Sequence, residues 1–116
     1  MLTLLLACAW TRTELYFGTE RPGGANVSEA EWDAFVAAEV APRFPAGFTV
    51  GEVSGHWRGP DGRDVVEGTH VVTVFVHGTR DQADAIAQAY ARQFGQDAVL
   101  VARNAARARF VSADGG

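Results

Sequence analysis

The side chains best suited to catalysis or ligand binding are spaced two residues apart on short segments of the chain. Arg12, Glu14 and Tyr16 alternate in this way, so in a strand their side chains point to the same side. His56 and Arg58 have the same spacing further along. We expect these five residues to share one face of a sheet and to form a ligand-binding site there.

Two kinds of chemistry fit this set of residues. Arginine can hold a small anion through two parallel N–H groups, and both Arg12 and Arg58 are suited to that role. His56, Glu14 and Tyr16 are the candidate catalytic residues, because each can act as a general acid or base. The simpler alternative is that arginine and glutamate on neighbouring strands only form cross-strand ion pairs.

The histidines do not predict a metal site. His70 and His77 are an odd number of residues apart in one predicted strand, so their side chains face opposite ways. His56 and His77 share a face but lie at opposite ends of the predicted hairpin. We expect His70, opposite Gly51 in that hairpin, to be a buried and hydrogen-bonded imidazole. No metal and no cofactor are expected.

Composition excludes several classes of function. The net charge of −4 disfavours nucleic acid, whose binding needs clustered positive charge. All 10 basic residues are arginine, which excludes a Schiff-base lysine and a P-loop lysine. The single Cys excludes an internal disulfide and a cysteine metal cluster. The length of 116 residues fits one domain, at 10–113, with a disordered tail at 114–116.

A hairpin is the strongest structural signal in the chain. Two β-rich runs, Phe48–Arg58 and Arg63–His77, flank the turn Gly59–Gly62. Proline presets the backbone of a turn and glycine supplies the positive φ that a turn needs. A four-residue loop pairs Arg58 with Arg63.

That pairing sorts the side chains of the hairpin into two faces. The set with Val66, Val72 and Val74 is the more apolar along the second run, so we assign it to the helices. The other face is then open and carries these ionisable residues: Arg12, Glu14, Tyr16, Glu52, His56, Arg58, Glu67 and His77. The assignment assumes a hairpin without a bulge, since one extra residue exchanges the faces.

The other elements follow from alternation, helical spacing and caps. In chain order they are a strand at 11–18, a helix from the capping box at Ser28 to Pro42, a helix from Thr79 or Asp81 to Gly95, and a strand at 97–103. The order β-α-β-β-α-β predicts an α+β, ferredoxin-like fold with a four-stranded antiparallel sheet in the order 4-1-3-2. Both helices cover one face, and two bare faces stacking together would give a homodimeric α+β barrel.

The first residues admit two interpretations. Leu5–Cys8 resembles the end of a bacterial lipoprotein signal, although the segment before it is short and has no Arg or Lys. If the true start lies upstream, residues 1–9 are the remnant of a leader, Cys8 carries a lipid, and the protein is exported to the envelope or periplasm. Otherwise the apolar run Leu2–Leu6 begins the first strand or packs on the core, and the protein is cytoplasmic.

Three blocks of the sequence resemble a known family. Trp10–Gly18, Val40–Gly47 and Gly55–Arg58 are similar to the signature blocks of the small bacterial family known as domain of unknown function 3574. The resemblance spans Trp10 to Phe110. Members are short exported proteins, so the resemblance favours the leader interpretation of Leu5–Cys8.

The resemblance implies no activity, because the family has none assigned. Its members usually have Gln at the position of His56 and Lys at that of His70, which weakens a catalytic role for either histidine. We therefore expect an exported, non-catalytic domain that binds a small polar or anionic ligand, or an envelope partner, through its open face. The alternative is a cofactor-independent enzyme of the dimeric α+β barrel type, acting as a monooxygenase, isomerase or lyase through His56, Glu14, Tyr16 and Arg58.

Overall fold

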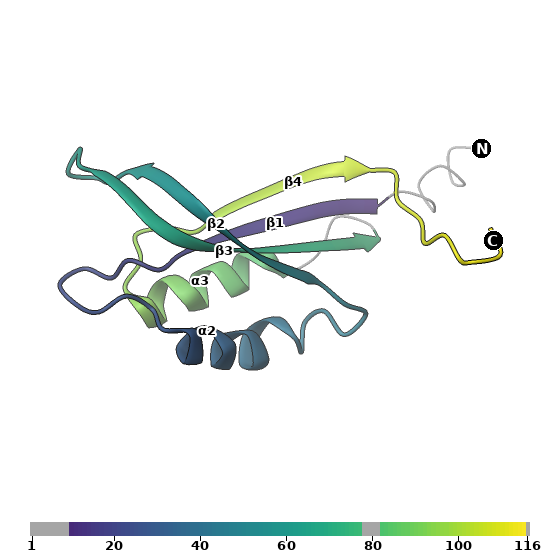
Figure 1. Ribbon diagram of the computed structural model, residues 1–116, viewed down its shortest axis with the longest axis horizontal. Helices are drawn as coiled ribbons and strands as arrows, with labels where there is room; N and C mark the ends of the chain where they lie inside the picture. The colour runs from purple at the N-terminus through teal and green to yellow at the C-terminus, as the bar shows by residue number, and fades with distance from the viewer. Residues whose placement is uncertain (1–9, 78–81, 116) are drawn as a thin grey trace.

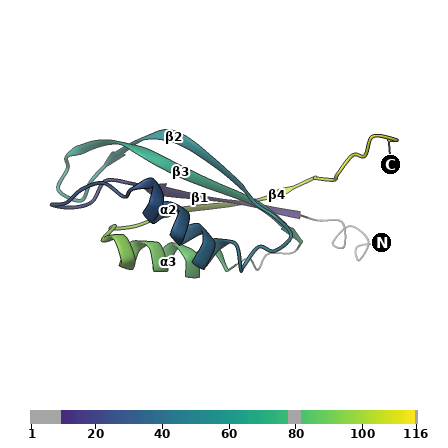
Figure 2. The same cartoon turned by 60° about the horizontal axis from the view of Figure 1, so that its bottom comes forward.

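The chain folds into a four-stranded antiparallel sheet with two helices on one face (Figures 1 and 2). This computed structural model describes residues 10–77 and 82–115. The elements are β1 (Trp10–Gly18), α2 (Glu29–Phe35), a π-helical turn (Val36–Val40), β2 (Thr49–Arg58), β3 (Asp64–His77), α3 (Ala83–Phe94) and β4 (Leu100–Ala106). The strand order β2-β3-β1-β4 is the predicted 4-1-3-2 order. The predicted ferredoxin-like α+β fold is therefore confirmed.

Residues 1–9, which include Cys8, lie outside the described residues, as do Thr79 and Asp81. The interpretations that rest on them stay predictions. Within the ranges that the structure describes, neither helix is long and apolar enough to cross a membrane.

Caps and turns set the ends of the helices. Ser28 accepts a hydrogen bond from the Glu31 amide while the Glu31 carboxylate accepts from the Ser28 amide, so the predicted capping box is confirmed. The helix passes into a wider π-helical turn, which the Ala41 amide closes on the Val36 carbonyl at 2.9 Å, and it ends before Pro42 as predicted. Gly95 caps α3 in the left-handed region.

The face of the sheet that packs on the helices is called the covered face here, and the opposite one the open face. In β1 the odd-numbered residues are buried on the covered face, so the predicted alternation of that strand is confirmed. His70, Val72 and Val74 of β3 lie on the same face, as expected. An aromatic cluster fills the space below them, formed by Phe17, Trp32, Phe35, Tyr90 and Phe94.

The predicted register of the hairpin was wrong by one residue. Arg58 pairs with Asp64, not with Arg63, and Glu52 pairs with His70. The cause is the turn: the Gly62 amide donates to the Gly59 carbonyl, and the Gly59 amide donates to Arg63. Gly62 takes a φ of +80°, the left-handed residue that follows a type I turn in a three-residue hairpin loop.

This shift exchanges the two faces of β2. His56 and Arg58 lie on the side of the covered face, while Val53 and Trp57 lie on the open face. The prediction that Arg12, Glu14, Tyr16, His56 and Arg58 share one face is therefore corrected: the three β1 residues share it, and the two β2 residues do not.

The last strand begins and ends three residues later than predicted. β4 pairs with β1 so that Leu100 lies opposite Tyr16 and Ala106 opposite Trp10. Residues 96–99 instead make the connection from α3, where the Gln96 side chain donates to the Glu20 carbonyl at 2.5 Å. Beyond β4 the chain leaves the sheet (Figure 1), and Phe110 is 90% exposed, so Phe110 does not anchor a fold-back of the tail.

Candidate functional site

A hydrogen-bonded triad occupies the open face of β1. The Glu14 carboxylate accepts from the Arg12 guanidinium at 2.5 Å and from the Tyr16 hydroxyl at 2.9 Å. Strand alternation places the three side chains in a row on one face of the sheet. Their strand, β1, is central and runs between β3 and β4. Each oxygen of the Glu14 carboxylate thus accepts one hydrogen bond from its own strand.

This triad fixes the protonation of Tyr16. The hydrogen bond to Glu14 raises the pKa of Tyr16 above its usual value, burial and the Glu14 charge add to the rise, and the Arg12 charge opposes it. Tyr16 is therefore a neutral hydroxyl that donates to Glu14 near neutral pH. It is suited to positioning a ligand and is a poor nucleophile or base.

A cavity of about 960 Å³ lies beside the triad on the open face. The end of the β2–β3 hairpin forms one wall and the α3–β4 connection forms the other. Its lining includes Tyr16, Trp57, Arg58, Glu67 and Leu100. The structure thus brings two of the predicted ligand residues, Tyr16 and Arg58, to one cavity.

A glycine positions the Trp57 ring in this cavity. A Cβ atom on Gly55 would overlap the indole Nε1 of Trp57 and the hydroxyl of Thr69. Gly55 is the one buried residue of β2, because the indole lies over it. The absence of a side chain at position 55 is what lets Trp57 lie against the sheet.

The remaining predicted site residues are dispersed. His56 is exposed, pairs with Val66 and lies on the side opposite to Tyr16. Arg58 borders the cavity at the end of β2, where its guanidinium forms a 3.0 Å ion pair with Asp64. The structure therefore joins Arg12, Glu14 and Tyr16, places Arg58 at the edge of their cavity, and puts His56 on the other side of the sheet from the three β1 residues.

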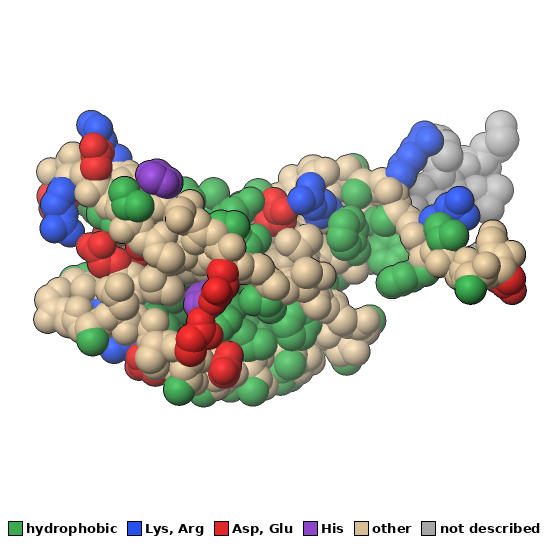
Figure 3. Space-filling view, viewed as in Figure 1, with side chains coloured by type: hydrophobic (Ala, Val, Ile, Leu, Met, Phe, Trp, Pro, Cys, Tyr) green, Lys and Arg blue, Asp and Glu red, His purple; other side chains and the backbone are tan. Residues whose placement is uncertain are grey.

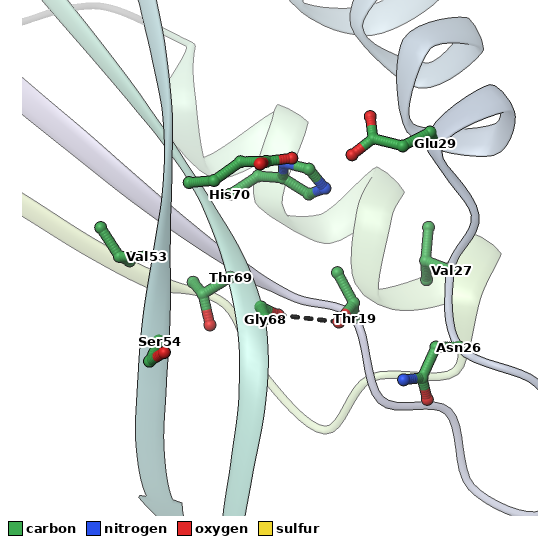
Figure 4. A pocket seen from close by; sticks show the side chains of 10 residues that line it. Thr19, Asn26, Val27, Glu29, Val53, Ser54, Gly68, Thr69 and His70 are labelled. Atoms are coloured by element: carbon green, nitrogen blue, oxygen red, sulfur yellow. Dashed lines mark hydrogen bonds and ion pairs between the residues drawn. The ribbon is translucent and has the colours of Figure 1, made fainter.

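A second cluster of ionisable residues lies between the covered face and α2. Glu52 comes from β2, His70 from β3, and Glu29 is the first residue of α2. Their ligand atoms lie within 4.8 Å of one another. Figure 3 shows acidic side chains gathered with a histidine between the sheet and α2, and Figure 4 shows the Glu29 and His70 side chains pointing toward each other.

His70 is held rigidly in this cluster. Its ring stacks on Trp32 at 4.2 Å between centroids and 4° between planes, and the residue is only 5% exposed. Its Nδ1 atom is buried without a hydrogen-bond partner and lies 3.7 Å from Glu52 Oε1. The predicted burial of His70 is confirmed, but the predicted hydrogen bond is not found at Nδ1, and the residue opposite is Glu52 instead of Gly51.

The two carboxylates of this cluster oppose each other. A hydrogen bond with Glu52 raises the pKa of Glu29, and burial and the charges of Glu52 and Asp33 add to the rise. Burial lowers the pKa of His70, with the charges of Glu52 and Asp33 acting in the opposite direction.

A cavity of about 510 Å³ adjoins this cluster and is lined by Glu29, Glu52 and His70. Thr19 also lines it, and its hydroxyl donates to the Gly68 carbonyl at 2.7 Å (Figure 4).

Sequence reasoning missed this cluster because its members come from three elements. No spacing in the chain links Glu29, Glu52 and His70. The usable signal was Gly62, since a left-handed residue at the end of the turn predicts the register that puts Glu52 opposite His70.

The fold and the two cavities define a small α+β domain with a helix-covered sheet face and a bare one. A family model, described as a protein of unknown function (DUF3574), matches residues 12–110. The chain belongs to this family, so the resemblance seen in the sequence is confirmed. The comparisons with curated proteins and with solved structures gave no match.

Proposed function

We propose that this chain is a binding module that takes a small organic cation into its open-face cavity. The observation that carries the proposal is the cavity itself, which is lined by Tyr16, by Trp57 and by more carboxylates than guanidiniums. Its volume of about 960 Å³ lies within the usual range for small-molecule sites.

The charge of the lining supports a cation over an anion, whereas the sequence led us to expect a small polar or anionic ligand. Four carboxylates and two guanidiniums line the cavity, namely those of Glu20, Asp61, Glu67, Asp97, Arg58 and Arg63. Both guanidiniums already have partners, since Arg63 pairs with Glu20 and Arg58 with Asp64, each at 3.0 Å. An anion would have to displace a carboxylate from either arginine.

The apolar lining supports an organic body on that cation. Trp57 and Leu100 remain 38% and 50% exposed in the cavity. An indole face attracts a cation through its quadrupole as well as by apolar contact. Tyr16, held by Glu14, presents its ring beside them.

The experiment compares three ligands that share one aromatic body. Benzylamine, benzyl alcohol and benzoate are titrated separately into the protein, and chemical shifts of the Trp57 indole and of residues 98–100 are followed by NMR. We expect the largest affinity for benzylamine and the smallest for benzoate. Equal binding of all three, or shifts confined to other surfaces, would overturn the proposal.

Matched variants locate the site. Trp57→Leu removes the aromatic face, and we expect it to weaken benzylamine binding on the order of fivefold. Val66→Ala shortens an exposed apolar residue on the other face of the sheet and should leave binding unchanged. Equal affinities in the two variants would place the ligand elsewhere.

The enzyme alternative gains less from the structure. Glu14 and Tyr16 are in contact, but His56 lies on the opposite side of the sheet from both. The acid–base group of that hypothesis is therefore not assembled around one cavity. It stays a prediction, and no observation favours it over binding.

A further inference from the structure

We propose that Glu29, Glu52 and His70 form a binding site for a divalent transition-metal ion. The site lies on the covered face between β2, β3 and α2, and it is independent of the ligand cavity on the open face. Two carboxylates and a neutral imidazole carry together the charge that balances a divalent cation.

The first argument is the state of His70. The side chain is 94% buried, yet Nδ1 has no hydrogen-bond partner and faces the Glu52 carboxylate. Leaving a buried nitrogen without a partner is energetically unfavourable, so structures seldom keep one without a use for it. A metal ion between the imidazole and the carboxylates would satisfy it.

The second argument is the charge around the cluster. The charges acting on Glu29 are those of Glu52 and Asp33, both negative. Within the part of the chain that the structure describes, no arginine forms an ion pair with Glu29 or Glu52. A bound cation would relieve the repulsion between the two glutamates.

The third argument is geometric. Donors that bind one ion at about 2.0–2.2 Å lie no more than about 4.4 Å apart, and the three donors here lie within 4.8 Å of one another. Trp32 fixes the imidazole by stacking, whereas both glutamates are exposed and free to rotate. A small rotation of either carboxylate would bring all three donor atoms within bonding distance of one ion.

The donor types indicate the class of ion. Imidazole nitrogen favours zinc, iron, nickel and copper, while magnesium and calcium prefer oxygen donors alone. No thiolate belongs to the cluster, which disfavours Cu(I). Three protein ligands leave a coordination position for water or for a small ligand from the adjoining cavity.

The test uses Zn²⁺ and the full chain. Because Cys8 could bind zinc by itself, all variants carry Cys8→Ser. Titration calorimetry near neutral pH should give one Zn²⁺ per chain, and NMR should show the His70 imidazole signals shifting first. Mg²⁺ at the same concentration should produce neither effect.

Two variants keep the test independent of folding. Glu52→Gln changes an exposed side chain of β2 without altering its shape, and we expect Zn²⁺ affinity to fall on the order of tenfold or more. His70→Gln should abolish the site, with circular dichroism reporting whether the fold survives. Each removes one donor from the set.

Matched controls complete the design. Asp64→Asn removes an exposed carboxylate from the neighbouring strand, and His77→Gln removes an exposed imidazole from the far end of β3. Neither should change Zn²⁺ affinity. The proposal is overturned if the chain binds no Zn²⁺, if Glu52→Gln binds as tightly as its parent, or if Mg²⁺ binds at this cluster and Zn²⁺ does not.

Discussion

At the scale of single residues, the two tyrosines respond to their surroundings in the same direction. Tyr16 and Tyr90 are the only tyrosines in the sequence. The hydrogen bond to Glu14 raises the pKa of Tyr16, and burial raises that of Tyr90. The Tyr90 hydroxyl also donates to the Gly18 carbonyl at 2.6 Å, which ties α3 to the end of β1.

These shifts predict a loss of stability in alkali. An unfolded tyrosine releases its proton near pH 10, while both folded tyrosines keep theirs. Above that pH the unfolded state binds fewer protons, so the free energy of unfolding falls as pH rises. The stabilisation is complete below about pH 10 and is lost as pH passes through the raised folded-state values.

Phenolate absorbance in the near ultraviolet measures this directly. We expect both tyrosines to ionise near pH 10 in urea and neither to do so in the native chain. Tyr16→Phe leaves Tyr90 as the one phenol that can ionise, so the contributions of the two tyrosines can be separated. One equivalent of phenolate near pH 10 in the native protein, with circular dichroism unchanged, would contradict the assigned environment of Tyr16.

At the scale of elements, the sequence predicted most of the fold correctly. The capping box at Ser28 and the alternation of β1 are local patterns, and the structure confirms both. The register of β2 against β3 failed because it depends on a single backbone choice, the left-handed conformation of Gly62, whereas the prediction assumed a four-residue loop. That one choice moved His56 and Arg58 off the predicted face and brought Glu52 to His70.

The importance of Gly62 can be tested by adding a methyl group. Gly62→Ala forces an L side chain into a φ of +80°, and we expect it to lower the free energy of unfolding by about 1 kcal/mol. Gly24→Ala is the control, since a Cβ there meets only the Pro22 carbonyl, at 4.0 Å. Urea denaturation measures both, and equal stabilities would mean that the turn does not hold the register.

At the scale of the whole molecule, the open face combines polar and apolar features. Large apolar side chains stay exposed on it, among them Val53, Trp57, Phe75 and Leu100, between 38% and 50%. The arrangement differs from that predicted, since the corrected register adds Val53 and Trp57 to this face and removes three ionisable residues of β2. The correction makes the face more apolar, which strengthens the expectation that a second copy stacks against it.

A charge on this face should therefore prevent self-association. Phe75 lies opposite Arg12 on the open face, near the end of the central strand β3, and is 44% exposed, so Phe75→Glu should leave the fold intact. We expect sedimentation velocity to show a dimer for the parent chain and a monomer for this variant, because removing the added carboxylate from water in the interface would cost several kcal/mol.

Val66→Glu is the matched control, because Val66 is on the same strand, 64% exposed, and on the opposite side of the sheet. It adds the same charge without touching the proposed interface, so the dimer should persist. A parent chain that stays monomeric at every concentration would exclude the predicted barrel. Equal dissociation of both variants would show that net charge, and not the open face, governs association. A dimer lost only in Phe75→Glu would place the ligand cavity, which shares this face, next to the interface between two copies.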